Sequence, residues 1–282
     1  MGNSFSAWFP ISSQRIGGEP ENLLYKGDFL NLLFYFNDMI NLDDIVKYTV
    51  PFDHYVIDNF FDLNFARSLE KEFITFNSKE WYCYSSQIEN KKALANWGDF
   101  PEKTYSAFSY FCSNQFTNLL KKVTGIDSLY PDYGLHGGGW HMHSSGGKLN
   151  IHKDYSIHPK LNLQRKLNLI VYLTENWNPD WGGSLEFWSH NPEENKPKEK
   201  VKDIECIFNR AVLFDTTQNS WHGLPIEINC PENVYRKSIA IYYLTDITNT
   251  IENRKRALYA PYGNQQNDPK VIELIKQRSI VA

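Results

Sequence analysis

The chain has 282 residues, of which 41% are hydrophobic and 15% aromatic, which is enough material for one large core. Its formal net charge of -4 and pI of about 6.1 give no general attraction for nucleic acid or an acidic membrane, so neither partner is expected. Four widely spaced cysteines without a CxxC pair, and the lack of an apolar run of membrane-spanning length or a secretory leader, favour a folded cytoplasmic protein.

The first 50 residues have the least regular pattern and are expected to form an N-terminal extension of uncertain structure. Met1, Gly2 and Ser6 match the short pattern for N-myristoylation, but no basic patch supplies a second membrane signal, so a chance match is favoured. An apolar stretch from Phe29 to Ile45 predicts a helix packed on the main body. The sequence gives no indication of the oligomeric state.

Residues 51–282 are expected to form a single domain, which begins with a helical part at about 51–128. A strand-like pattern runs from Tyr55 to Phe61, and Asp62 then predicts the N-cap of a helix. The apolar face of this helix would carry Phe65, Leu69 and Phe73.

A second helix is predicted between Thr104 and Val123. Apolar residues recur there at steps of three and four, the spacing of one helix face, and Gly125 is placed to end the helix. The residues of this face are Phe108, Cys112, Phe116, Leu119 and Val123. We expect this face to pack in the core rather than to bind a ligand.

From about 130 to 246 the pattern changes to short strands separated by Gly, Pro and Asn. The clearest strands expected are Lys148–His152, Lys166–Leu173, Ser184–Trp188, Cys206–Phe214 and Lys237–Leu244. About eight such strands favour a mainly β fold with flanking helices, in which a double-stranded β-helix (jelly roll) core follows an N-terminal helical scaffold. The charged run Pro192–Lys202 is expected to be a solvated loop. The tail, 247–282, is predicted to end in a C-terminal helix that Asp268 and Pro269 start.

Histidines cluster between residues 136 and 158, which makes this region the first place to look for a metal site. His152 and Asp154 are separated by one residue, so at a strand end both side chains point to the same side. His222 follows the apolar strand Ala211–Phe214 and would bring a third ligand from another strand. Two imidazoles and one carboxylate leave three open positions on an octahedral metal, the arrangement with which Fe(II) binds a chelating cosubstrate and O2.

A candidate carboxylate receptor follows His222 at the start of the last expected strand. The guanidinium of Arg236 offers a bidentate fork, and the Ser238 hydroxyl, two positions along, faces the same way. Tyr172 on another strand could donate a further hydrogen bond. These three residues are therefore candidates for holding the distal carboxylate of a dicarboxylate cosubstrate.

This ordered set resembles the signature of the Fe(II)/2-oxoglutarate-dependent dioxygenases, in particular the prolyl 4-hydroxylase-like branch, over about residues 130–246. The segments Leu167–Trp177, Gly182–Leu185 and Val212–Phe214 are similar to that branch in order and spacing. The resemblance implies a jelly roll with Fe(II) at the three metal-ligand candidates, 2-oxoglutarate and O2 as cosubstrates, and Arg236 on the distal carboxylate. It also implies that a C–H bond is hydroxylated while succinate and CO2 are released.

The substrate is much less determined. Trp140, His141 and His143 follow a run of glycines and are candidates for substrate contact, although structural residues beside a turn would look the same. Arg165 is expected at a solvated strand end. The substrate would be a prolyl or other residue of a protein or peptide, or, with the same chemistry, a small molecule or sugar-linked compound. An alternative of another class is a cupin-like zinc hydrolase or a non-catalytic metal-binding module, neither of which needs Arg236.

Overall fold

A computed structural model describes residues 40–248 and 253–279, which belong to one compact unit. Gly2 and most of the stretch for which a helix was expected, from Phe29 onward, lie outside the described residues. The described part of that stretch is not helical, and Ile45 begins a strand that pairs with the next one. The sheet thus already includes residues assigned to the N-terminal extension, while the division into an extension and one domain stays a prediction.

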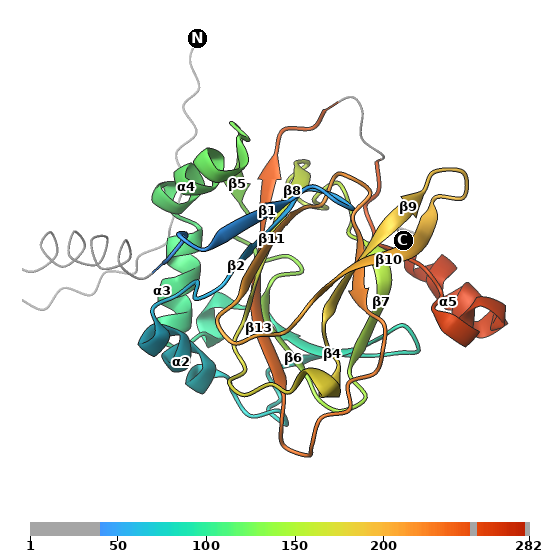
Figure 1. The fold of residues 1–282 in the computed structure, drawn as a ribbon, viewed down its shortest axis with the longest axis horizontal. Coiled ribbons are helices and arrows are strands. Elements are labelled where there is room, and N and C mark those ends of the chain that lie inside the picture. Colours follow the sequence, from blue (N-terminus) through green and yellow to red (C-terminus); the bar gives the residue numbers. More distant parts are fainter. Residues whose placement is uncertain (1–39, 249–252, 280–282) are drawn as a thin grey trace, which may run out of the picture. The chain divides into compact units, whose positions relative to one another are not determined.

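Within the described residues, fourteen strands form one continuous antiparallel sheet that bends back on itself (Figure 1). Eight of them, β6 to β13, divide into two four-stranded halves. One half has the order β6-β13-β8-β11 and the other β7-β12-β9-β10, and β4 joins the halves by pairing with both β6 and β7. The strands are β1 (Ile45–Tyr48), β2 (His54–Ile57), β3 (Tyr82–Ser85), β4 (Glu89–Leu94), β5 (Tyr130–Pro131), β6 (Gly139–His143), β7 (Lys148–Lys153), β8 (Gln164–Tyr172), β9 (Leu185–Asn191), β10 (Lys196–Ile204), β11 (Ala211–Asp215), β12 (Trp221–Leu224), β13 (Arg236–Thr245) and β14 (Leu258–Tyr259).

The two halves pack face to face through a buried apolar cluster at one end of the space between them. Phe187 comes from β9 and Phe214 from β11, and Phe52, just before β2, contacts both rings. This is the layout of a jelly roll, so the predicted fold class is confirmed. Polar side chains line a cavity that adjoins this cluster.

Helices α2 (Leu63–Glu72), α3 (Glu102–Phe111) and α4 (Asn114–Thr124) lie on one side of the sheet, and α5 (Pro269–Ser279) lies on the opposite side (Figure 1). Asp62 caps α2 as expected, since its carboxylate accepts hydrogen bonds from the backbone of Asn64 and Phe65. No described helix is both long enough and apolar enough to cross a bilayer. All four cysteines are free thiols.

Two expectations about local structure are wrong. The single helix expected between Thr104 and Val123 is two helices, because Ser113 leaves the helical conformation and caps α4 through Phe116 N, although the helix does end at Gly125. The run Pro192–Lys202, expected to be a loop, largely belongs to strand β10, which pairs with β9. Its lysines suit the outer edge of a sheet, where charge discourages pairing with another chain.

Gly139 sets how closely strands β4 and β6 approach. Its φ of +87° is one that side chains rarely adopt, and a Cβ at this position would collide with the carbonyl oxygen of Leu94 and lie 2.8 Å from Ala95 Cα. Gly125 has a similar φ of +74° but faces open space. A side chain at Gly125 would therefore meet conformational strain alone, whereas one at Gly139 would meet both strain and a steric collision.

We predict that Gly139→Ala lowers the free energy of unfolding by roughly 3 kcal/mol or more, because strain and collision add. Gly125→Ala, with strain alone, should cost about 1 kcal/mol. Urea unfolding of both variants measures the difference. Equal losses would mean that the backbones of β4 and β6 can separate without cost.

Candidate active site

Two histidines lie opposite each other on neighbouring strands. His152 on β7 pairs in register with His222 on β12, so both rings project from the same face, with centroids 4.3 Å apart. Asp154 follows the end of β7, and its carboxylate oxygens lie 3.7 Å from His152 Nε2 and 3.8 Å from His222 Nε2. One ligand atom from each residue lies within 4.8 Å of the others, close enough to bind one metal ion.

Backbone contacts fix the orientation of both imidazoles. His152 Nδ1 lies 2.9 Å from the carbonyl oxygen of Asn150, and His222 Nδ1 lies 2.8 Å from that of Ser220. A proton on each Nδ1 would donate to these carbonyls and leave Nε2 as an unprotonated donor facing Asp154. Burial and the neighbouring His152 lower the pKa of His222 to about 4, so this ring is neutral at neutral pH.

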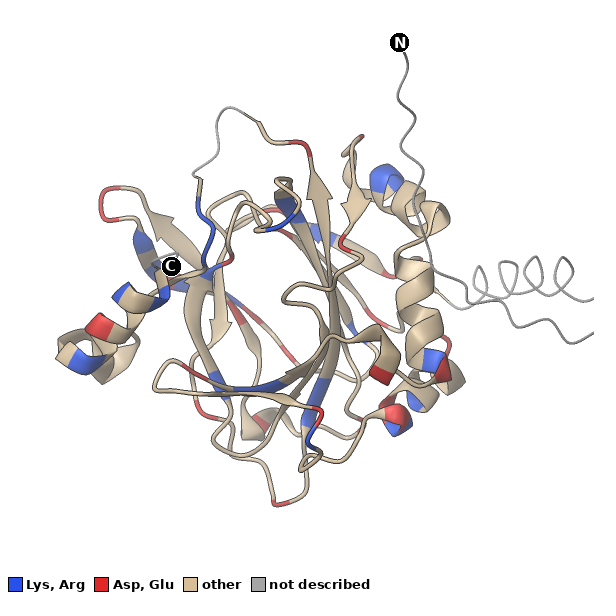
Figure 2. Cartoon of the chain, turned by 180° about the vertical axis from the view of Figure 1, so that it is seen from behind, with Lys and Arg blue, Asp and Glu red and all other residues tan. Residues whose placement is uncertain are grey.

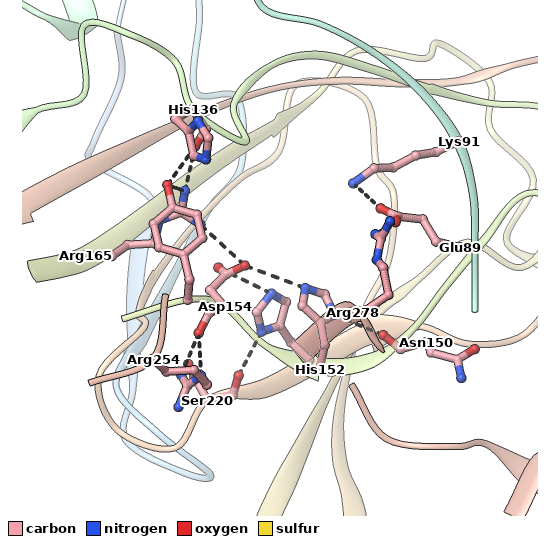
Figure 3. Close-up of polar contacts among 12 residues, drawn as sticks. Glu89, Lys91, His136, Asn150, His152, Asp154, Arg165, Ser220, Arg254 and Arg278 are labelled. Carbon is pink, nitrogen blue, oxygen red and sulfur yellow. Dashed lines mark hydrogen bonds and ion pairs between the residues drawn. The ribbon is translucent and has the colours of Figure 1, made fainter. Parts of the chain in front are cut away.

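Arg165 keeps Asp154 ionised and in place. Its Nη1 lies 3.5 Å from Asp154 Oδ1, and Nη2 donates to the carbonyl oxygen of His136 (Figure 3). Burial alone would raise the pKa of Asp154, but Arg165 and both imidazoles outweigh it and hold the pKa well below its usual range. The carboxylate is thus charged and available to a cation.

The placement of Arg165 corrects the expectation of a solvated strand end. The guanidinium is only 2% exposed and is enclosed by two tyrosine rings, 3.5 Å from the centroid of Tyr155 and 3.3 Å from that of Tyr242. Regular alternation along β8 would place Arg165 on the face of Leu167, away from the cavity, so the sequence pattern gave no signal for its position. The pairing of β8 with β13 shifts register between Tyr243 and Leu244, where Arg165 pairs. Arg165 therefore belongs to the site.

The second polar group is built on β13 and its two neighbours. Arg236 is 3% exposed, its Nε donates to the carbonyl oxygen of Gly183 at 2.7 Å, and its guanidinium carbon lies 4.8 Å from the centroid of the Tyr172 ring. Ser238 is two residues further along and pairs in register with Tyr172 on β8. Among the described residues, no hydrogen-bond partner reaches the buried Tyr172 hydroxyl. Burial also raises the pKa of this hydroxyl, which keeps it a proton donor.

A cavity of about 400 Å³ joins the two groups. The metal-ligand candidates line it together with Arg165, Arg236 and Ser238. His141 and His143 also line the cavity. They lie opposite Ser238 and Arg236 in the pairing of β6 with β13, so all four side chains share one face of the sheet. Burial lowers the pKa of His141 to about 3 and that of His143 well below its usual range, so both are neutral.

Trp140 does not reach this cavity. It lies on the other face of β6, is fully buried, and stacks on Phe73 with ring centroids 4.6 Å apart. The centroid of the Phe100 ring lies 5.3 Å from that of Trp140. The structure thus separates Trp140 from His141 and His143, with which the sequence grouped it, because successive residues of a strand point to opposite faces.

The donor set fits Fe(II) together with a chelating dicarboxylate. Two neutral imidazoles and one carboxylate at one end of the cavity are the facial set of non-haem iron sites. At the other group, the buried Tyr172 hydroxyl and both ring nitrogens of His143 lack partners among the described residues, beside Arg236. Because His143 is neutral, one of its ring nitrogens donates and the other accepts. Its N–H and the Tyr172 hydroxyl are buried donors that require an acceptor, which the distal carboxylate of 2-oxoglutarate would provide.

Comparison with known proteins gives a family for the middle of the chain. Residues 138–244 match the family model of the 2OG-Fe(II) oxygenase superfamily. The mouse prolyl 3-hydroxylase OGFOD1 is 28% identical over 173 residues, which are 61% of this chain and 29% of that protein. The chain therefore spans less than a third of the length of this relative.

Solved structures give further, weaker likenesses. A Pseudomonas putida prolyl-4-hydroxylase is 15% identical, covers 69% of this chain and 92% of its own, and has a TM-score of 0.48. A Trichoplax adhaerens prolyl hydroxylase bound to a hypoxia inducible factor peptide is 18% identical, with coverages of 79% and 94% and a TM-score of 0.47. By the family match and the geometry of the cavity, residues 138–244 are similar to the 2OG-Fe(II) oxygenase superfamily, whose enzymes use Fe(II), 2-oxoglutarate and O2.

Proposed function

We propose that the chain hydroxylates a C–H bond of a prolyl residue in a protein or peptide, with 2-oxoglutarate converted to succinate and CO2. The observation that carries the oxygenase part is one cavity that holds both the histidine–aspartate set and the buried Arg236. The prolyl part is supported by the name of the mouse relative, a prolyl 3-hydroxylase. We also propose a cytoplasmic location, with which four free thiols agree.

In this proposal His152, Asp154 and His222 hold the iron, and Arg236 binds the distal carboxylate of 2-oxoglutarate through its fork. The bound iron and cosubstrate supply the oxidising chemistry. Tyr172 donates its hydroxyl to the same carboxylate and Ser238 adds a hydrogen bond. The protein's part is to fix orientation, because each of these side chains is buried and lies in a strand or, for Asp154, directly after one.

Arg165 acts as a positioning residue in this scheme. Its contact with Asp154 Oδ1 leaves Oδ2 as the oxygen without a hydrogen-bond partner among the described residues, and Oδ2 is also the oxygen nearer His222. The two tyrosine rings around Arg165 exclude water from the guanidinium, which strengthens its hold on the carboxylate. The metal would therefore meet a carboxylate whose rotation is already restricted.

The proposal predicts that the protein loaded with Fe(II) without oxygen develops a weak visible charge-transfer band when 2-oxoglutarate is added. Exposure to O2 should then yield succinate, slowly even without substrate. Absorption spectroscopy and succinate assay measure the two steps. Protein that binds zinc, gives no band and forms no succinate would instead support the hydrolase or metal-binding alternative.

We predict that Arg236→Ala raises the KM for 2-oxoglutarate by roughly 100-fold, since truncating one side of a buried charge pair costs about 3 kcal/mol. Arg236→Lys should restore part of the affinity, because it keeps the charge but loses the fork. Iron affinity should not change in either variant. Arg67→Ala, which removes an exposed ion pair with Glu175, is the matched control. An unchanged KM in Arg236→Ala would refute the assignment of this residue.

For the metal site, we expect His222→Ala and Asp154→Asn to weaken Fe(II) binding by 100-fold or more, on the order of 3 kcal/mol, since each removes one of three ligands. Competition with a chelating dye measures the affinity. Thermal unfolding and 2-oxoglutarate titration of the metal-free variants check that the cavity is intact. Normal iron binding in both variants would place the metal elsewhere.

A further inference from the structure

A third charged group lines the same cavity and has no part in the metal site or the cosubstrate site. Glu89, at the start of β4, is only 3% exposed. Lys91 Nζ lies 3.1 Å from Glu89 Oε1, and Arg278 Nη2 donates to Glu89 Oε2 at 2.5 Å. In Figure 3 the two cations converge on Glu89, on the far side of His152 from Arg165.

This group lies beside the metal-ligand candidates and also reaches solvent. The guanidinium carbon of Arg278 is 5.8 Å from the centroid of the Tyr259 ring, and that ring stacks on His152 with centroids 5.2 Å apart. One aromatic ring thus separates Arg278 from a metal-ligand candidate. The Arg278 side chain is 40% exposed, so the group lies where the cavity opens.

The charges that line the cavity do not balance. Among the described residues that line the cavity, four are Lys or Arg and two are Asp or Glu, an excess of two positive charges. A divalent metal and the dianion 2-oxoglutarate cancel each other, so the loaded cavity keeps this excess. The chain as a whole carries -4, and acidic and basic residues are both spread over its elements (Figure 2). The excess of positive charge is thus confined to the cavity and is not shared by the chain as a whole.

Apolar packing also holds α5 in place, beside the ion pair of Arg278. An apolar cluster around Val271 packs the helix against Ile88 and Tyr259, with Leu274 and Ile275 at its border. One carboxylate faces two cations, so a net positive charge remains at the opening after both contacts are made. A second anion would neutralise the remaining positive charge of Lys91 and Arg278.

We propose that Lys91 and Arg278 form an anion site at the opening of the cavity, which selects a substrate with a carboxylate or phosphate close to the reacting carbon. The substrate half of this inference rests on the proposed function, whereas the anion site itself does not. In a peptide substrate the anion would be an acidic side chain next to the target proline. Glu89 orients the two cations and tempers their charge.

Inorganic phosphate is the probe for the site. The full chain is loaded with Mn(II) and N-oxalylglycine, an unreactive analogue that fills the 2-oxoglutarate site, and phosphate is titrated by calorimetry and by 31P relaxation. We expect saturable binding with paramagnetic broadening, which places phosphate near the metal. Lys91→Gln and Arg278→Gln should each weaken binding five- to tenfold. Lys148→Gln, which loses only a surface ion pair with Glu227, should bind like the unaltered chain.

Glu89→Gln separates an anion site from a structural ion pair. Removing the negative charge should tighten phosphate binding about fivefold, whereas a purely structural role predicts loss of stability and no gain in affinity. Thermal unfolding of all variants accompanies the titration. The anion site is refuted if phosphate does not saturate, if it does so without broadening, or if both cation variants bind like the unaltered chain.

Failure of the proposed function would be seen separately, as a failure to bind Mn(II) or N-oxalylglycine. Phosphate is then titrated into metal-free protein, where the same two variants must still weaken binding. A second experiment tests which kind of substrate carries the anion: succinate release is measured with prolyl peptides that carry Glu, Gln or Lys beside the proline. A KM at least fivefold lower for Glu than for Gln, abolished by Lys91→Gln, supports an acidic peptide. Turnover of free organic acids alone would identify a small molecule, and equal turnover of all three peptides would refute the selection.

Discussion

The antiparallel pairing of β7 with β12 is the constraint on which the site depends. Register places His152 directly opposite His222, and because opposite residues share a face, the distance between the two imidazoles follows from backbone hydrogen bonds. Asp154 leaves the end of the same strand and needs no element of its own. A slip of one residue in either strand would turn a histidine to the other face and abolish the set.

The second polar group depends on β13 in the same way. Arg236 and Ser238 point into the cavity from the central strand, while β6 on one side and β8 on the other contribute His143 and Tyr172 at neighbouring positions. Both polar groups are thus built from backbone register rather than from loops. Sites on paired strands keep their geometry with little loss of conformational entropy on binding, which favours a tightly oriented cosubstrate.

Much of this was predictable from the sequence, and the failures have physical causes. The spacing of His152 and Asp154, and the alternation around Arg236, depend only on the two-residue period of a strand, which is local. Glu89 and Arg278 lie 189 residues apart, and only the tertiary fold brings them to one cavity. Trp140 was grouped with its neighbours by proximity in the chain, although strand geometry sends it into the aromatic core.

The break between α3 and α4 has a different origin. The apolar residues on either side keep the spacing of a single helix, so periodicity alone could not reveal it. The capping hydrogen bond of Ser113 ends one helix and begins the other, and serine also occurs inside helices. Arg165 was misplaced for a related reason, since a charged residue near a strand end is usually solvated and the two enclosing tyrosines come from other segments.

The C-terminal position of Arg278 has a consequence for how such an enzyme can diversify. The segment that matches the superfamily ends at residue 244, yet Tyr259 and Arg278, which wall the cavity beside His152, come after it. Reaction chemistry and part of the cavity wall are therefore encoded in consecutive stretches of the chain. Exchange of the tail between relatives would change what the cavity admits while His152, Asp154 and His222 stay in place, so the range of molecules that enter the cavity could evolve by recombination at a single junction.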